Sequence, residues 1–564
     1  MKFSEFPYKR PQIKEIEDKF NDLLRSFQSA SSFDEQDKAL KNINELRSDY
    51  ESMAEIAMIR HTIDTNDETY KEEQEYFDEV QPHYQALVSN YYQALVDSKF
   101  RRELENKWGK QLFKIAELTL KTFSPEVIED LQEENKLASE YRNLIASAKI
   151  MFEGEERNLA QLGPFIQSAD RDVRRKASEA KYSFYAANEE KLDDIYDRMV
   201  KVRTRIARKL GFKNFVELGY ARMTRTDYNR DMVAGFRDQV KASLVPVATR
   251  LKEKQRARID VDTLTYYDDT FQFKSGNPRP KGDPQWILEN GKKMYAELSP
   301  ETNEFFTFMS ENELMDLVSK KGKSSGGYCT YISKFGAPFI FSNFNGTSGD
   351  IDVLTHEAGH AFQVYTSRGY GVPEYFFPTY EAAEIHSMSM EFFTWPWMEL
   401  FFQEETDKYK FSHLSSALLF IPYGVSVDEF QHFVYENPDA TPAERKQAWR
   451  DIERKYLPHR NYAENDYLER GGFWHQQGHI FSSPFYYIDY TLAQICALQF
   501  WQKSQENRES AWEDYVRLCE KGGSLSFTEL VKVAGLVSPF EDGCINEVVK
   551  GTESWLDKVE DASL

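Results

Sequence analysis

Two histidines four residues apart, with a glutamate directly after the first, are the part of this 564-residue sequence best suited to chemistry. The pentad His-Glu-Ala-Gly-His occupies residues 356–360. Residues four apart on an α-helix project from one face, about 6 Å apart along the axis, so His356 and His360 can bind one metal ion. Glu357 points to a neighbouring face, where it can take a proton from a metal-activated water without binding the metal. The pattern therefore predicts metal-assisted hydrolysis.

The flanks of the pentad predict the helix that this geometry requires. Apolar residues recur at roughly helical spacing on both sides of it, namely Ile351, Val353, Leu354, Ala361, Phe362 and Val364. Gly349 and Asp350 stand where a helix start is expected. Gly359 lowers helix propensity by about 1 kcal/mol relative to alanine, so we expect it to allow another backbone or the substrate to approach closely. Two surface histidines on an ordinary helix are the alternative interpretation.

A catalytic zinc site needs a third protein ligand and one open position. Residues 379–391, TYEAAEIHSMSME, predict a second helix with four candidates: Glu381, Glu384, His386 and Glu391. Spacing alone does not choose among them, because Glu384 shares a face with Glu391 and is also a near neighbour of Glu381. A buried carboxylate can instead orient a ligand histidine without binding the metal. For most of these residues a solvated helix face is the simpler interpretation.

The pentad and the segment TYEAAEIHSMSMEFF together resemble the M3 family of zinc metallopeptidases, in its oligoendopeptidase F and Pz-peptidase branch. The family pattern is His-Glu-x-Gly-His, followed by a Glu ligand in a Glu-x-x-Ser-Met context, and this sequence matches it without departure. The resemblance implies that His356, His360 and Glu384 bind one Zn²⁺ per chain and that Glu357 is the general base. The likeness extends over the segment near 148–230 and the tail beyond 470.

A second constellation, RGGFWHQQGHIFSSPFYYIDY at residues 470–490, fits the same chemistry. Peptide hydrolysis builds negative charge on the carbonyl oxygen, which preorganised O–H and N–H donors stabilise. Such donors are available from His475, His479, Tyr486, Tyr487 and Tyr490. The resemblance implies substrate contacts for His479, Tyr486 and Tyr490, of which the two tyrosines lie one helical turn apart. Because the chain has 32 tyrosines, a tyrosine cluster that only packs in the core is the alternative.

Two short runs upstream, residues 326–332 and 336–343, are rich in aromatic and β-branched residues and bounded by glycines, which predicts strands. Pro338 lacks an N–H group and predicts that its strand lies at a sheet edge. An edge strand beside the zinc-binding helix would pair with an extended peptide. The glycine-rich approach KKGKSSGGY, residues 320–328, predicts either a mobile flap or a plain hairpin.

The composition restricts the possible partners. Lys and Arg number 71 against 93 Asp and Glu, a net charge of -22, so we expect no binding to nucleic acid or to an anionic membrane. No apolar run approaches the roughly 18 residues of a membrane-spanning helix, and the N-terminus lacks the apolar core of a signal peptide. We predict a cytoplasmic protein. Its four cysteines are scattered without CxxC pairing, and a Cys–His nucleophile at Cys329 is a minor alternative.

The periodicity predicts a mainly α fold with a small β-sheet next to the zinc-binding helix. The family resemblance adds two helical lobes around a deep substrate channel with zinc at its floor. We divide the chain into residues 1–190, a helical region with a short hairpin near 148–165, and residues 191–564, the catalytic region. The oligomeric state stays open.

The function predicted from these residues is a zinc-dependent endopeptidase that cleaves short oligopeptides. A zinc carboxypeptidase or dipeptidase is an alternative, because the pentad does not set internal against terminal cleavage. A non-catalytic peptide-binding protein is a second alternative, although structural zinc usually has four protein ligands, often cysteines.

Overall fold

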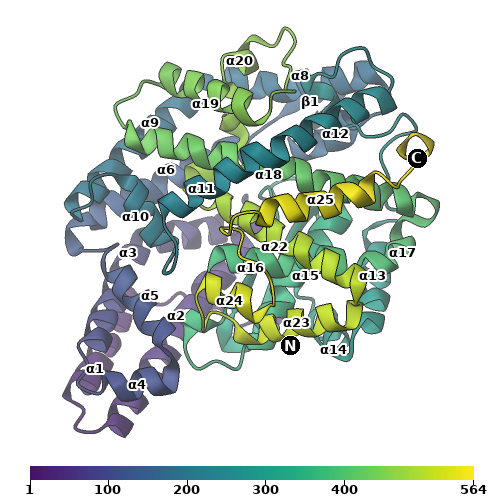
Figure 1. Cartoon of the computed structure of the whole chain (residues 1–564). Coiled ribbons are helices and arrows are strands. Elements are labelled where there is room, and N and C mark those ends of the chain that lie inside the picture. Colours follow the sequence, from purple (N-terminus) through teal and green to yellow (C-terminus); the bar gives the residue numbers. More distant parts are fainter.

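The computed structural model describes the backbone of residues 1–564 and every side chain except that of Ala562. It is mainly helical, with one β-hairpin and one small sheet beside the helix of the pentad, which confirms the predicted fold class (Figure 1). The division into two lobes around a channel stays a prediction. Among the residues that the structure describes, no helix combines the length and apolarity needed to cross a membrane.

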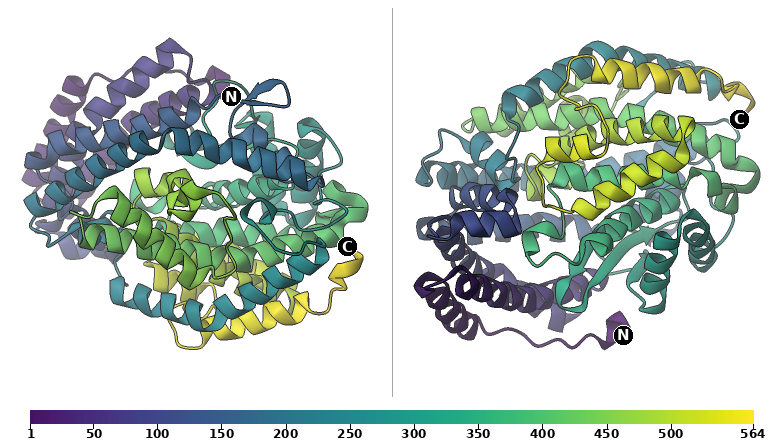
Figure 2. Two further views of the ribbon diagram at one scale, coloured as in Figure 1. Left: turned by 90° about the horizontal axis from the view of Figure 1, so that it is seen from above. Right: turned by 60° about the horizontal axis from the view of Figure 1, so that its bottom comes forward.

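The first helices pack together at one side of the molecule (Figures 1 and 2). They are α1 (Ile13–Ser29), α2 (Phe33–Ile63), α3 (Glu68–Val96), α4 (Arg101–Trp108) and α5 (Lys110–Leu120). Amphipathic spacing explains this layer, since α1 buries Ile16, Phe20, Leu24 and Phe27 on one face. Tyr375, which lies far along the chain, joins their core, and its hydroxyl accepts a hydrogen bond from the backbone N–H of Leu112 at 2.9 Å.

The next segment contacts this layer where α6 packs on α3 and α10 on α5, and it carries the predicted hairpin. Its helices are α6 (Ile128–Ala146), α7 (Gly163–Ile166), α8 (Arg171–Ala187), α9 (Glu189–Lys209), α10 (Phe215–Arg222), α11 (Arg230–Gln239) and α12 (Val245–Arg258). Strands β1 (Ile150–Phe152) and β2 (Glu155–Arg157) pair antiparallel around Gly154, as predicted. Residue 190 lies in the first turn of α9, and the domain division there stays a prediction.

Helices α13 (Pro284–Leu298) and α14 (Pro300–Glu311) lead into a three-stranded sheet of order β3–β5–β4. Its strands are β3 (Met315–Val318), β4 (Tyr328–Ile332) and β5 (Ala337–Phe344). The prediction that the strand of Pro338 lies at the edge is wrong, because β5 is central and β4 is an edge. The proline is tolerated since β3 pairs with β5 only from Ile340 onward, which leaves Pro338 with a neighbour on the β4 side alone.

The pentad lies on α15 (Gly349–Ser367), and ten further α-helices follow it in the chain that the structure describes. They are α16 (Tyr380–Phe393), α17 (Glu399–Phe402), α18 (Thr406–Glu436), α19 (Pro442–Tyr456), α20 (Asp466–Glu469), α21 (Gly478–Ser482), α22 (Tyr487–Glu506), α23 (Arg508–Lys521), α24 (Phe527–Val533) and α25 (Cys544–Leu556). Helix α16 packs against both α15 and α22. Gly359 permits this, because a Cβ there would lie 2.6 Å from Ser387 Cα and 2.7 Å from the His386 carbonyl oxygen. The sequence-based expectation of a close backbone approach at Gly359 is confirmed.

Candidate metal centre and cavity

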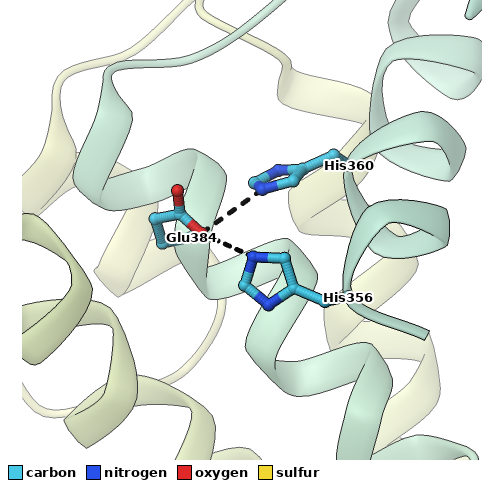
Figure 3. A group of neighbouring side chains, drawn as sticks. All are labelled: His356, His360 and Glu384. Carbon is cyan, nitrogen blue, oxygen red and sulfur yellow. Dashed lines mark ion pairs between the residues drawn. The ribbon is translucent and has the colours of Figure 1, made fainter. Parts of the chain in front are cut away.

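Three side chains from two helices converge between α15 and α16 (Figure 3). His356 and His360 lie one turn apart on α15, and Glu384 faces them from α16. Their Nε2 atoms are 3.1 Å and 3.3 Å from Glu384 Oε2. All three ligand atoms lie within 4.8 Å of one another. Two imidazole nitrogens and one carboxylate oxygen that face one point make a donor set suited to a divalent cation such as zinc.

Glu384 is held in place by two hydroxyl groups. Tyr486 donates to Oε1 at 2.5 Å, and Ser387 donates to Oε2 at 2.8 Å. Burial alone would raise the pKa of this carboxyl, but the neighbouring rings of His360 and His356 outweigh it and lower the pKa well below its ordinary value. The side chain is therefore an ionised carboxylate with a fixed orientation, as a metal ligand must be.

The other three candidates on α16 lie elsewhere. Glu381 and His386 are buried away from the two rings, and burial raises the pKa of Glu381 well above its ordinary value and lowers that of His386 to about 3. Glu391 contacts His356 from behind, where its Oε1 accepts a hydrogen bond from Nδ1 at 2.7 Å. Spacing left four possibilities open, whereas the fold brings only Glu384 to the convergence point among the described residues.

A hydrogen-bonded chain fixes the tautomer of His356. The indole N–H of Trp395 donates to His413 Nδ1 at 3.2 Å, so Nδ1 is an acceptor and the ring proton of His413 lies on Nε2. That nitrogen donates to Glu391 Oε2 at 2.8 Å, and Glu391 Oε1 takes the Nδ1 proton of His356. The Nε2 atom of His356 is thereby left to face Glu384 and the convergence point, where it can bind a metal ion. Carboxylate–histidine pairs of this kind orient metal ligands.

Glu357 lies beside the two histidines, as the pentad predicts, and faces a cavity. It is 6% exposed, and its Oε2 atom has no hydrogen-bond partner among the described residues. Burial raises its pKa above the ordinary glutamate value, although the rings of His356 and His360 partly oppose this. A carboxylate with a free oxygen and an elevated pKa is well suited to accept a proton.

The cavity over these groups has a volume of about 520 Å³. Its walls come from distant parts of the chain, with Ile115 on α5, Cys329 on edge strand β4, Glu384 on α16 and Tyr490 on α22. Gly327 keeps the side of β4 open, because a Cβ there would lie 3.2 Å from Glu357 Oε1. Burial raises the pKa of the Cys329 thiol well above its ordinary value, which disfavours the alternative of a thiolate nucleophile.

A second hydrogen-bonded chain orients the predicted donors from the C-terminal segment. Tyr423 donates to Gln477 Oε1 at 2.8 Å, which directs the Gln477 amide nitrogen to His479 Nδ1, also at 2.8 Å. Burial lowers the pKa of His479 to about 4, so the ring is neutral at pH 7 and carries its proton on Nε2. That nitrogen lies 3.1 Å from the Tyr490 hydroxyl oxygen. When His479 donates to it, the hydroxyl proton of Tyr490 is free for another acceptor.

The five residues predicted as possible oxyanion donors therefore differ in whether they line the cavity over the pentad. His479, Tyr486 and Tyr490 all line the 520 Å³ cavity, and the rings of the two tyrosines stack with centroids 4.9 Å apart. Tyr487 lines a neighbouring cavity instead. His475 is fully buried and bonded to Asp193 and Tyr467, so it lies outside both cavities.

The loop predicted as a flap or a hairpin is anchored to the sheet. Lys323 is buried, and its ammonium group donates to the backbone carbonyls of Asp316, Val318 and Ser342 at 3.1, 3.0 and 2.5 Å. The side chain of Asn343 donates to the carbonyls of Ser324 and Gly326, each at 2.8 Å. These bonds fix the approach to Gly327 and disfavour a mobile flap. The loop is not a hairpin turn either, because it joins β3 to β4 and both of these strands pair with β5 instead of with each other.

Sequence reasoning missed His413, Trp395, Gln477 and Tyr423, whose side chains orient the candidate groups. His413 lies 22 residues after Glu391 and Tyr423 lies 54 residues before Gln477, so no local motif links them. The one available signal was the shared helix face of Glu384 and Glu391, which places a second carboxylate near the histidines.

Comparison with known proteins gives a consistent set of relatives. The family profile described as peptidase family M3 matches residues 165–277 and 295–549, and a profile described as the peptidase M3 N-terminal domain matches residues 3–123. An oligoendopeptidase F homolog from Borreliella burgdorferi is 24% identical over 393 residues, and oligopeptidase PepF from Bacillus subtilis is 21% identical over 424 residues. These matches cover 66% and 70% of this chain, which spans 63% and 58% of the relatives' own lengths.

Solved structures resemble the chain along its whole length. A structure of Pz peptidase A with an inhibitor is 67% identical, with a TM-score of 0.99 and 100% of both chains covered. A structure assigned to an oligoendopeptidase F from Bacillus anthracis strain Ames is 61% identical, with a TM-score of 0.95, and the match covers 100% of this chain and 99% of that one.

Proposed function

The chain belongs to peptidase family M3, as its motifs predict, and from that premise we propose that it is a zinc-dependent endopeptidase of short oligopeptides. The observation that carries the proposal is the convergence of His356, His360 and Glu384 beside a glutamate whose Oε2 atom is unpartnered. The cavity of about 520 Å³ above them has room for part of a flexible peptide and excludes a folded protein.

We assign His356, His360 and Glu384 as the ligands of one zinc ion per chain. The donor set of two imidazoles and one carboxylate is common to catalytic zinc sites. The orientation of each ligand supports this assignment, since Glu391 fixes the tautomer of His356 while Tyr486 and Ser387 fix Glu384. When bound there, zinc would supply Lewis-acid polarisation of the scissile carbonyl and would lower the pKa of water.

Glu357 is the proposed general base. Its free Oε2 atom accepts a proton from the attacking water, and its elevated pKa lets it hold that proton. The same atom then donates the proton to the leaving nitrogen of the cleaved peptide bond. Gly327 supports this role because the absence of a side chain there leaves the carboxylate accessible from β4.

Tyr490 is the proposed donor to the carbonyl oxygen as negative charge develops on it. The chain from Tyr423 through Gln477 to His479 orients its hydroxyl and leaves the hydroxyl proton for the substrate. His479 acts through Tyr490 in this scheme. Tyr486 also lines the cavity, and its hydroxyl contributes through Glu384, to which it donates.

Two alternatives remain open to a direct test. A carboxypeptidase or dipeptidase would need a free peptide terminus, and a non-catalytic binding protein would cleave nothing. The decisive measurement uses a quenched fluorescent peptide with both ends blocked, in buffer with zinc, with chelator, and with zinc restored. We expect cleavage that the chelator abolishes and zinc restores, and mass spectrometry should locate an internal cut. Cleavage only of unblocked peptides would favour the terminal peptidases.

The ligand assignment is tested separately by the variant Glu384→Ala. We expect zinc content, measured by metal analysis after gel filtration, to fall well below one ion per chain, because two histidines alone hold zinc weakly. An unchanged zinc content would place the third ligand elsewhere. We also propose short peptides as partners and the cytoplasm as the location, which subcellular fractionation would test.

A further inference from the structure

A second cavity borders the first one on the far side of His479 and Tyr490. It has a volume of about 310 Å³, and both of these side chains line both cavities. Its other walls come from four helices, with Asp352 on α15, Met388 and Glu391 on α16, Ser416, Ala417 and Phe420 on α18, and Tyr487 and Gln494 on α22. Ser416 is exposed, so this cavity reaches the protein surface. It therefore lies between the proposed catalytic residues and solvent.

One wall of the second cavity carries an unused hydrogen-bond donor. Gln494 is 6% exposed, and its Nε2 atom has no hydrogen-bond partner among the described residues. An unpaired amide N–H group in such a buried position is unfavourable unless a ligand or water satisfies it. Because Gln494 lines this cavity, rotation of its amide toward the cavity would present this N–H group to a carbonyl group there.

The rest of the lining defines what would carry that carbonyl. Phe420 and Tyr487 pack edge to face with ring centroids 5.7 Å apart, and Met388 and Ala417 add apolar surface. The titratable groups at the cavity are the carboxylates of Asp352 and Glu391 and the imidazole of His413. An apolar side chain suits these walls, whereas a free carboxylate would face two like charges.

We propose that the second cavity is a substrate subsite that binds a peptide residue with an apolar side chain, on one side of the scissile bond. Gln494 donates to a backbone carbonyl of that residue, while Phe420, Tyr487, Met388 and Ala417 surround its side chain. The proposal rests on the function assigned above and extends it. Such a subsite would make the enzyme prefer peptides long enough to extend past His479 and Tyr490. It would also disfavour a free α-carboxylate in the second cavity.

The test compares a minimal blocked peptide with the same peptide extended by one leucine at either end. For the wild type we expect kcat/KM to rise about tenfold on extension at one end, since burial of an apolar side chain has about that effect. The variant Ser416→Trp adds bulk at the exposed mouth of the cavity and should return the ratio of extended to minimal peptide to about one. The variant Ser510→Trp, at an exposed helical serine on α23, is the matched control and should keep the wild-type ratio.

A second variant isolates the hydrogen bond. Gln494→Met keeps the length of the side chain but removes the amide, and it should lower the ratio about threefold to tenfold. The proposal is overturned if extension has no effect at either end, or if Ser416→Trp and Ser510→Trp give the same ratio. Calorimetric binding of both peptides to Glu357→Gln repeats the comparison without turnover. If no peptide is cleaved yet this binding ratio follows the same pattern, the subsite stands and the peptidase assignment fails.

Discussion

Two buried clusters of carboxylates in this protein differ in how their charge is balanced. In one, Glu134 on α6 pairs with Arg203 on α9 and Arg222 on α10. Each of the three guanidinium nitrogens of Arg203 donates a hydrogen bond. In the other, Glu384 and Glu391 are bonded to histidines and hydroxyls, and neither pairs with lysine or arginine among the described residues. The first cluster is complete as it stands, whereas the second one lacks a permanent cation.

The difference separates structural from catalytic burial of charge. Near neutral pH, guanidinium partners balance the charge of a buried carboxylate and occupy its hydrogen-bonding positions, so that carboxylate is not available to a ligand. A carboxylate held only by imidazoles and hydroxyls keeps one side available, and a divalent cation at the convergence point would complete its charge balance. If the two clusters differ in this way, substitutions near the metal centre should reduce turnover at neutral pH far more than a substitution in the Glu134 cluster.

The largest effect is expected from Glu357→Gln. The amide cannot accept the proton of the attacking water, so kcat should fall by about a thousandfold. Zinc content should stay near one ion per chain, because Glu357 is not a proposed ligand. Metal analysis and single-turnover cleavage of a blocked peptide check both statements on one sample. Retained activity with a full complement of zinc would reject the role of Glu357 as base.

Tyr490→Phe should have the next largest effect. Loss of a donor to the developing oxyanion lowers kcat by about a hundredfold and leaves KM nearly unchanged. Tyr486→Phe is the informative partner, because its hydroxyl donates to Glu384 and its loss should act on zinc affinity. Steady-state kinetics at saturating zinc separate the two. Equal losses of kcat in both variants, with zinc fully bound, would remove the distinction that we draw between these tyrosines.

The sequence was most informative where function depends on local spacing. The i, i+4 histidines predicted the helix of residues 349–367 and its chemistry, because both ring positions follow from helix geometry alone. The choice of Glu384 over Glu381, His386 and Glu391 did not follow from spacing. It depends on how α16 is rotated against α15, and Gly359 allows the two helices to approach closely beside Ser387.

The sequence was least informative about contacts between distant segments. Pro338 predicted an edge strand because proline cannot donate to a ladder, yet β3 is short enough to leave that end of a central strand unpaired. Two residues further along the chains that orient His356 and His479, namely His413 and Tyr423, come from α18, which is buried along most of its length and carries no motif. Such partners become visible only when helices far apart in sequence are placed side by side.

Glu391→Gln tests the link between His413 on α18 and His356. The amide nitrogen would face the N–H group of either His413 or His356, so one of the two rings must change tautomer. We expect zinc affinity to fall tenfold to a hundredfold, with a smaller loss of kcat at saturating zinc. Competition with a fluorescent zinc chelator measures the affinity. Glu381→Gln, a buried glutamate on the same helix, is the control and should bind zinc like the wild type.

The smallest effect on turnover is expected in the structural cluster. Burial would raise the pKa of Glu134, but Arg222 and Arg203 outweigh it and lower the pKa to about 2. Above pH 4.3, the ordinary glutamate pKa, the carboxylate is ionised in both folded and unfolded chains and its stabilisation is fully present. As the pH falls below that value, the unfolded chain binds the proton first, and about 2 kcal/mol of stability is lost by pH 3.

Glu134→Gln removes this dependence, so its free energy of unfolding in urea should change less between pH 5 and pH 3 than that of the wild type. Glu133→Gln is the matched control, because Glu133 is exposed and pairs with Arg205 at the surface. It should keep the wild-type slope. At pH 7, turnover per folded molecule of Glu134→Gln should fall less than tenfold. A larger loss would mean that this ion cluster also positions the catalytic groups. The connection would be the bonds from Arg203 to the backbone carbonyls of Ile480 and Phe481, which follow His479 on α21.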